Sequence, residues 1–389
     1  MISVHIVSNV FPPQPGGLQR WTEALATMLS EAGFRPIVYI CAHPAVADLN
    51  RDAPFEIVDV APLADVWTAP LRDLWVGSQA LARDRSRVAF ACLKAEIAKR
   101  SSSEPQIVLS NFITTAGFTA HLVAQELSLG HVAVVVGTDY ARGLRNPEER
   151  YLFQDVCASA RLVVAKSEEQ RRGIARLVPN ARMEVIGTSV DVPEARWRRS
   201  PASPIRIFAD CGFSFKKGTG VLIDACRALA GNGIGVHLEI CGGDQPREST
   251  YWAERRGEAS QVPGLSTSFP GHLEPGDMIG RMLDADIYAS ATLGEGSSEG
   301  RARALCAGIP MVTTRCGELF EDPGADHLRL APVADAPAFH AELSGLARKM
   351  IEGDWTIDDN VVAAYRARFD RQAEWSRWID LLRREAVCG

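Results

Sequence analysis

The sequence has no long apolar run, no basic excess and no leader-like amino terminus. Although 46% of its 389 residues are hydrophobic, no run approaches the roughly 18 apolar residues that a membrane-spanning helix needs. The formal net charge of −6 argues against a basic surface for nucleic acid or an acidic membrane. A strand pattern begins at once, without a basic leader, so we expect a cytoplasmic protein without a signal peptide.

Paired cysteines are also missing, and lysine is rare. The nine cysteines are scattered and never spaced C-x-x-C, which excludes a zinc pattern and a disulfide framework and favours reduced thiols. Only six of the 42 basic residues are lysine, so the adjacent pair Lys216 and Lys217 stands out.

Short β-branched runs alternate with amphipathic stretches along the whole chain, a pattern typical of βα units around parallel sheets. The expected strands cover residues 2–8, 36–41, 107–110, 132–136, 162–165, 183–186, 205–210, 236–241, 287–289 and 311–314. The expected helices include residues 17–32, 88–100, 117–126, 218–230 and 276–283.

A Pro-, Ser- and Arg-rich stretch at residues 191–204 has no apolar periodicity and is predicted to be a linker. The chain is therefore expected to hold two doubly wound domains of similar size, at residues 1–195 and 196–360, followed by terminal helices at 361–389.

An acidic Gly- and Ser-rich loop precedes a short Ala/Arg helix that stops at Gly308 and leads through Pro310 into an apolar strand. Glycines and serines before a helix leave its first backbone N–H groups uncovered, which favours an anion site. Glu295 in this loop would repel a bare phosphate, but it suits a neutral, hydroxyl-rich group attached to one. Residues 294–314 therefore predict a cradle for a phosphorylated sugar.

Two other loops come between a strand and a helix. In residues 11–19, Gly16 and Gly17 let a ligand or a second domain approach the backbone, although a plain Pro/Gly turn is as compatible with the pattern. In residues 210–218, a lysine can reach a phosphate while Gly218 clears space for it; a solvated lysine pair is the alternative.

Two shorter loops carry candidate ligand contacts. Gly242 and Gly243 end a strand and fit a wall for a flat base or a ribose, or a simple turn. Asp139 follows another strand and is either an acceptor-orienting group or a residue that caps the next segment.

Together these motifs resemble the family 4 retaining glycosyltransferases of the GT-B fold, over nearly the whole chain. The motifs that carry the resemblance are Phe11-Pro12-Pro13 with Gly16-Gly17, Lys216-Lys217-Gly218, Cys241-Gly242-Gly243, Asp284-Ala285-Asp286, and Glu295-Gly296 leading to Ala307-Gly308-Ile309-Pro310. The resemblance implies an α/β fold of two Rossmann-like parallel-sheet domains with an interdomain cleft and a C-terminal helix that returns to the first domain.

The resemblance also implies that the second domain holds a nucleotide-diphosphate sugar. Lys217 would contact the diphosphate with Lys216 beside it, and Glu295 would face the hydroxyls of the donor sugar. The first N–H groups of the following helix would meet the distal phosphate, namely those of Gly296, Ser297, Ser298 and Glu299. No metal or other cofactor is expected, because lysine and helix-terminal N–H groups take the place of Mg²⁺.

The remaining contacts implied by the resemblance involve both domains. Gly243 and the backbone around His272 would lie against the base of the donor. Gly16 and Gly17 would close the cleft from the first domain, which holds the acceptor, and Asp139 would orient that acceptor.

The sequence departs from the family pattern at three positions. Gly212 stands where similar enzymes usually carry Arg, Arg303 where they carry a second Glu for the ribose, and Val136 where His or Arg is common. Arg303 either forms a solvated pair with Glu299 one turn earlier, or supplies at the diphosphate the cation lost at Gly212.

The sequence thus predicts a metal-independent, retaining hexosyltransferase that uses a nucleotide-sugar donor and a small-molecule, lipid or glycan acceptor. Two alternatives stay open, namely another GT-B enzyme such as a sugar-nucleotide epimerase, and a catalytically degenerate, transferase-like scaffold subunit. No nucleic-acid partner and no transmembrane segment are expected, and the pattern does not indicate the oligomeric state.

Overall fold

The computed structural model describes residues 1–14, 16–41, 49–50, 52–63, 79–197, 203–243 and 248–387. The chain divides into two compact units, of which the first comprises Met1–Gly187 with Gln372–Gly389 and the second Thr188–Arg371. Within the described residues, no helix is both long enough and apolar enough to cross a membrane. The eight cysteines that the structure describes are all free thiols.

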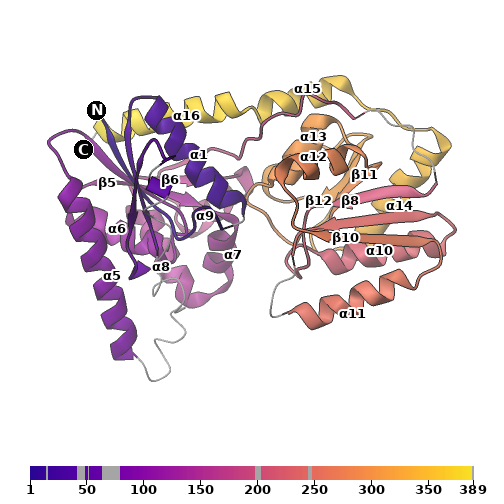
Figure 1. The fold of residues 1–389 in the computed structure, drawn as a ribbon, viewed down its shortest axis with the longest axis horizontal. Coiled ribbons are helices and arrows are strands. Elements are labelled where there is room, and N and C mark those ends of the chain that lie inside the picture. The colour runs from indigo at the N-terminus through magenta and orange to yellow at the C-terminus, as the bar shows by residue number, and fades with distance from the viewer. Residues whose placement is uncertain are drawn as a thin grey trace. The chain divides into compact units, whose positions relative to one another are not determined.

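The first unit contains a seven-stranded parallel sheet with the order β3-β2-β1-β4-β5-β6-β7 (Figure 1). Its strands are β1 (Ser3–Val7), β2 (Arg35–Ile40), β3 (Glu56–Asp59), β4 (Gln106–Ser110), β5 (Gly130–Val135), β6 (Leu162–Ala165) and β7 (Met183–Val185). Its helices are α1 (Gly17–Glu31), α5 (Gln79–Arg100), α6 (Ala116–Glu126), α7 (Gly137–Arg145), α8 (Pro147–Ser159), α9 (Glu168–Leu177) and α16 (Arg371–Val387).

Alternate residues of these strands face opposite sides of the sheet, and both sides are apolar. Ile6 and Val134 belong to a core shared with α1 and α16, whereas Val108 and Val135 face the helices on the other side. The expected return of the C-terminal helix to the first domain is confirmed, because α16 packs on this sheet beside α1 (Figure 1).

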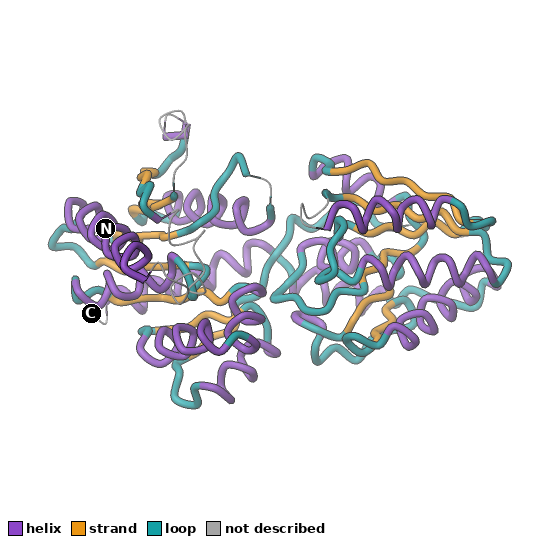
Figure 2. The backbone as a smooth tube through the Cα atoms, turned by 90° about the horizontal axis from the view of Figure 1, so that it is seen from below, coloured by secondary structure: helices purple, strands orange, loops and turns teal. Residues whose placement is uncertain are grey.

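The second unit repeats this plan with a six-stranded parallel sheet of order β10-β9-β8-β11-β12-β13. Figure 2 shows its strands in orange and its helices in purple. Its strands are β8 (Ile205–Ala209), β9 (Val236–Cys241), β10 (Leu265–Gly271), β11 (Ile287–Ser290), β12 (Met311–Thr314) and β13 (Leu328–Ala331). Its helices are α10 (Thr219–Gly231), α11 (Ser249–Ser260), α12 (Pro275–Leu283), α13 (Glu299–Ala307), α14 (Ala336–Glu352) and α15 (Asp359–Arg368), with a 3-10 turn at Gly317–Leu319. The expected class of two doubly wound parallel sheets is confirmed.

The units divide at other residues than the expected ends at 195 and 360. Residues 191–197, expected to belong to a linker, pack on the second unit, because Trp197 is buried and its indole N–H donates to the carbonyl of Ala285 at 2.7 Å. Helix α15 also belongs to the second unit, where Arg366 donates to the carbonyl of Cys306 at 2.8 Å. Residues 198–202 of the expected linker lie outside the described residues.

The strand order of the second sheet reverses between β8 and β11, which are neighbours although α10, β9, α11, β10 and α12 separate them in sequence. In doubly wound sheets, ligands bind outside the carboxyl ends of the strands at such a switch point. The loop after β8 carries Lys216 and Lys217, and the loop after β11 carries Glu295. The fold therefore brings these two predicted loops to the position where a ligand is expected.

Candidate functional site

Lys217 and Glu295 form an ion pair across the two loops. The Nζ atom of Lys217 lies 2.6 Å from Oε1 of Glu295, and 34% of the lysine side chain is exposed against 11% of the glutamate side chain. Burial alone would raise the pKa of Glu295, but Lys217, Arg301 and Lys216 attract the carboxylate and hold its pKa below the usual value. The site thus presents an ionised carboxylate beside a partly exposed ammonium group.

Hydrogen bonds hold the two loops together. The backbone N–H of Leu293 donates to the carbonyl of Lys216 at 2.8 Å, and the hydroxyl of Thr292 lies 3.3 Å from the same carbonyl and 3.2 Å from Oε1 of Glu295 in its own loop. The side chain of Lys216 is exposed, so its charge remains accessible beside that of Lys217. The loops therefore form one structural element, which carries Lys216, Lys217 and Glu295.

Helix α13 begins at Glu299, directly after the loop of Glu295. Ser298 is the N-cap, and its hydroxyl accepts the backbone N–H of Arg301 at 3.3 Å. The hydroxyl of Ser297 accepts the N–H of Thr188 at 3.4 Å, so it supports the loop from inside the unit. The predicted short helix is confirmed, and it ends at Gly308 as expected.

Arg303 pairs with Glu299, one helical turn earlier, with 2.9 Å between Nη2 and Oε2. The expected pair is therefore present, but its description as a solvated surface pair is wrong, because only 9% of the arginine side chain is exposed. Residues 300–307 of α13 are all buried, which shields this side chain from solvent.

Gly212, where the resemblance leads us to expect an arginine, has no room for a side chain in this structure. Its φ of 59° lies in the left-handed region, and a Cβ there would lie 2.8 Å from the carbonyl oxygen of Gly243. The loops after β8 and β9 thus approach too closely for a side chain. The imidazole of His272 lies against Gly243, where a Cβ would be 2.9 Å from its Nε2 atom, and His272 is exposed.

The other predicted residues lie in the first unit. Gly16 is the N-cap of α1 and Gly17 is its first residue, whereas Pro15 lies outside the described residues. Asp139 is 1% exposed in the first turn of α7, and its carboxylate accepts the N–H of Ile113 at 3.1 Å. Burial raises the pKa of Asp139 to about 7, against the opposing effect of backbone N–H groups.

Sequence reasoning missed a set of charged and polar contacts beneath the loop that carries Glu295. Arg301 is fully buried and pairs with Glu318 at 2.9 Å, and Tyr288 donates its hydroxyl proton to Asp210. Asp210 also fits against Gly300, where a Cβ would lie 1.8 Å from its Oδ2 atom. The sequence offered no signal for Arg301, because Glu299 and Arg303 on the same short helix give it the look of a surface helix.

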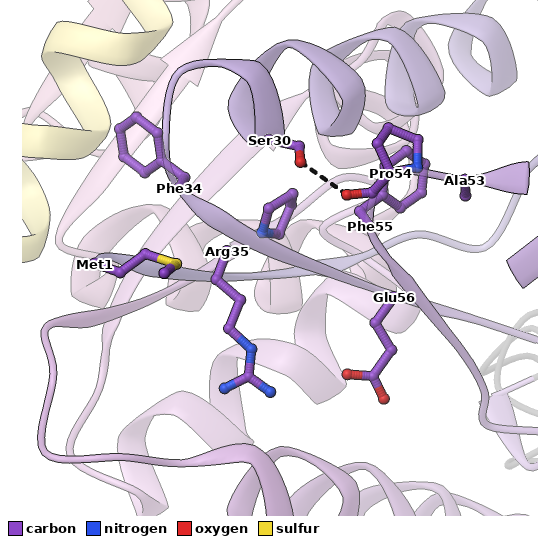
Figure 3. A pocket seen from close by; sticks show the side chains of 9 residues that line it. Met1, Ser30, Phe34, Arg35, Ala53, Pro54, Phe55 and Glu56 are labelled. Carbon is purple, nitrogen blue, oxygen red and sulfur yellow. Dashed lines mark hydrogen bonds between the residues drawn. The ribbon is translucent and has the colours of Figure 1, made fainter.

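A shallow hollow of about 430 Å³ lies in the first unit, at the end of the sheet where its strands begin (Figure 3). It is lined near the amino ends of β1, β2 and β3 by residues that include Met1, Arg35 and Glu56. Because ligands of doubly wound sheets bind at the carboxyl ends, this hollow is not part of the candidate site. Among the described residues, no group of three or more His, Cys, Asp or Glu is placed to hold a metal ion.

Comparisons with known families divide the chain in a similar way. Residues 15–194 match the family described as Glycosyltransferase Family 4, and residues 207–349 match Glycosyl transferases group 1. The Escherichia coli (strain K12) protein named "Putative colanic acid biosynthesis glycosyltransferase WcaL" is 28% identical over 182 residues. That match spans 44% of this chain and 43% of the relative, which is less than half of its length.

Solved structures resemble the whole chain. Sucrose-phosphate synthase from Thermosynechococcus elongatus gives a TM-score of 0.73 at 14% identity and covers 100% of both chains. Anabaena Alr3699/HepE in complex with UDP-glucose gives 0.72 at 17% identity, over 98% of this chain and 99% of that one. The lipopolysaccharide outer core galactosyltransferase WaaB gives 0.68 at 12% identity, over 97% and 98%. These likenesses show a shared fold.

Proposed function

Because the chain belongs to the family 4 glycosyltransferases and has their GT-B fold, we propose that it transfers a hexose-type sugar from a UDP-sugar to a hydroxyl of its acceptor, with retention at the anomeric carbon. The observation that carries this proposal is the ion pair of Lys217 and Glu295 at the switch point of the second sheet. UDP is proposed as the nucleotide because the structurally similar Anabaena protein binds UDP-glucose.

Lys217 would stabilise the leaving diphosphate. Its side chain is 34% exposed, so the ammonium group can turn from Glu295 to a phosphate oxygen. Lys216 adds a second cation, and the N-terminal end of α13 adds its partial positive charge. A fixed positive environment stabilises the negative charge that develops on UDP as its bond to the sugar breaks.

Glu295 would bind the sugar. Its carboxylate is ionised at neutral pH and mostly shielded from solvent, with the pKa lowered as described above. An ionised carboxylate accepts hydrogen bonds from hydroxyl groups, and such bonds are stronger than those between neutral partners. Glu295 can therefore hold the hexose while Lys217 holds the phosphates.

Retention is proposed to follow from attack on the face that UDP leaves. The acceptor oxygen forms a bond to the anomeric carbon as the bond from that carbon to the phosphate oxygen breaks, and the acceptor proton passes to an oxygen of the departing UDP. This route needs no protein nucleophile. We also propose metal independence, because Lys216, Lys217 and the helix terminus supply the positive charge. Asp139 would act indirectly, by holding the backbone at Ile113.

The test measures binding of UDP, GDP, ADP and UDP-glucose to the whole chain by calorimetry and thermal unfolding. We expect UDP and UDP-glucose to bind and to raise the melting temperature. Lys217→Met should weaken UDP binding about 30-fold, since a lost hydrogen bond to a charged group costs roughly 2 kcal/mol. Lys349→Met is the matched control, because Lys349 forms a partly exposed pair with Asp326 on other elements of the same unit.

Two results would contradict the proposal. If no nucleotide diphosphate binds, the chain is a transferase-like scaffold rather than an enzyme. If UDP-glucose is converted to an isomerised sugar without any acceptor, the chain is an epimerase.

A further inference from the structure

Arg301 is a cation in the interior of the second unit. It lies on α13, is fully buried, and ranks among the largest side chains with that degree of burial. Removing a charge from water costs several kcal/mol unless partners surround it. The contacts of Arg301 therefore indicate what its charge supports.

The guanidinium of Arg301 joins α13 to the loop that follows β12. Its Nη2 atom donates to Oε2 of Glu318 at 2.9 Å and to the carbonyl of Cys316 at 3.3 Å, and Nη1 donates to the carbonyl of Thr314 at 3.3 Å. The planar fork of an arginine suits such multiple contacts, which a lysine cannot reproduce. The loop at residues 314–318 is thus fastened to the first turns of α13.

This loop lies directly against the backbone that carries Glu295. Gly317 has a φ of 61°, and a Cβ on it would lie 3.0 Å from the carbonyl oxygen of Glu295 and 3.1 Å from that of Gly296. The same Cβ would be 3.2 Å from Nη2 of Arg301. Arg301 consequently holds the layer on which the donor loop rests.

Side-chain hydroxyls continue the connection to the carboxylate itself. Thr314 donates to the carbonyl of Thr292 at 2.6 Å, and Thr292 donates to Oε1 of Glu295 at 3.2 Å. Both threonines are buried, at 3% and 0% exposure. A largely buried chain of hydrogen bonds of this kind favours a single arrangement of its side chains.

We propose that Arg301, paired with Glu318, is a positioning residue that keeps Glu295 in place for the sugar half of the donor when Lys217 turns to the diphosphate. This inference rests on the proposed function. Lys217 is partly exposed and can leave Glu295, whereas Arg301 is enclosed and stays. The position of Glu295 therefore does not depend on Lys217, which moves to the diphosphate.

The charges around Glu295 agree with this division of roles. Besides Lys217, the cations that attract its carboxylate are Arg301 and Lys216, and Glu318 lies behind Arg301 as the counter-charge. Lys216 is exposed and, like Lys217, is available to the phosphates. Among these cations, Arg301 is the one enclosed by the protein.

The experiment compares the affinities of UDP and UDP-glucose, since only the second ligand carries the sugar. In Arg301→Met we expect UDP affinity to stay within about twofold, while affinity for UDP-glucose relative to UDP falls about tenfold. Arg301→Lys keeps the charge without the planar guanidinium group and should lose less of the affinity for UDP-glucose relative to UDP. Arg255→Met removes another ion pair in the same unit, with Asp224, and should leave the ratio unchanged.

A double-mutant cycle separates positioning from general destabilisation. Glu295→Gln should lower the same ratio, and adding Arg301→Met to it should change the ratio little further, because both substitutions remove one interaction. A merely structural role would give independent losses. The preference for UDP-glucose should be lost as the pH is lowered and Glu295 becomes protonated. In Arg301→Met this loss should begin at a higher pH than in the wild type, since removal of the cation raises the pKa of Glu295.

The inference is overturned if folded Arg301→Met keeps the wild-type ratio, or if it weakens UDP and UDP-glucose equally. Should Arg301→Met not fold, Thr292→Val removes the last hydroxyl of the chain; a lower ratio supports the inference and an unchanged ratio refutes it. Failure of the wild type to bind either ligand would instead refute the proposed function.

Discussion

The two units share a backbone plan but differ in the chemistry at the carboxyl edges of their sheets. At the switch point of the first sheet, Asn111 donates to the hydroxyls of Ser8 and Thr22 at 3.1 and 3.4 Å, so these contacts join uncharged groups. At the corresponding point of the second sheet, Lys217 and Glu295 form an ion pair.

This difference indicates which part of a reaction each edge suits. Fixed opposite charges fit a ligand that is anionic at one end and rich in hydroxyls at the other. Neutral amides and hydroxyls fit a neutral, hydroxyl-bearing group. The same strand order thus serves two chemistries, because the loops and not the sheet carry the functional groups.

The largest effect that would sharpen this comparison concerns Asp139 in the first unit. Its pKa is about 7 in the folded protein, whereas an exposed aspartate has a pKa near 3.8. The folded protein therefore keeps a proton that the unfolded chain loses between about pH 4 and 7. The stability of the wild type should therefore fall as pH rises through this window. We expect Asp139→Asn to gain roughly 2 kcal/mol relative to the wild type between pH 5 and 8.

Urea unfolding at pH 5, 6.5 and 8 measures this gain, with Asp155→Asn on the exposed side of α8 as the control. If the unfolding free energies of the wild type and Asp139→Asn depend on pH in the same way, the prediction is wrong and the buried carboxyl does not make the stability of the first unit pH-dependent.

A second, smaller effect concerns Arg303 in the second unit. Arg303→Glu would place two carboxylates one turn apart on a shielded part of α13, and should lower the unfolding free energy by about 1–2 kcal/mol. If Arg303 also compensates for the missing cation at Gly212, UDP affinity should fall about tenfold, and less in Arg303→Ala.

Calorimetry with UDP checks this prediction, and Arg329→Glu, which breaks a pair with Asp326 on other elements, is the matched control. Unchanged UDP affinity in both Arg303 variants would limit this arginine to a structural role.

The smallest expected effect compares two serine N-caps, one in each unit. Ser298 caps α13 at the candidate site, and Ser167 caps α9 in the first unit by accepting the N–H of Gln170 at 3.4 Å. Each Ser→Ala substitution should cost about 1 kcal/mol of stability. Only Ser298→Ala should also weaken UDP-glucose, by about threefold. Equal affinities in the two variants would show that the start of α13 does not contribute to the site.

The strands predicted from the sequence are all present, whereas three others were overlooked. The overlooked strands β3, β10 and β13 lie at sheet edges, as does β7, which was predicted. Edge strands have one neighbour and need less continuous apolar sequence, as the mostly half-buried residues of β10 illustrate. The central strands were predictable because they are buried on both faces.

The candidate site was predictable to a similar extent. Lys217 and Glu295 were found because each follows an apolar strand, and carboxyl ends of parallel strands meet at one edge. Arg301 and Glu318 were not found, because an arginine in a short helix looks like a surface residue until its contacts with the loop after β12 are known.

By itself, the sequence determined the α/β class, the positions of the central strands and the loop residues that form the charged pair. These features follow from local patterns: apolar period, turn residues and the helix stop at Gly308. The tertiary structure decided that residues 191–197 and α15 join the second unit, that Asp139 is buried, and that Arg301 is enclosed against the loop after β12. These features depend on which distant segments cover a residue, and burial by distant segments leaves no local pattern in the chain.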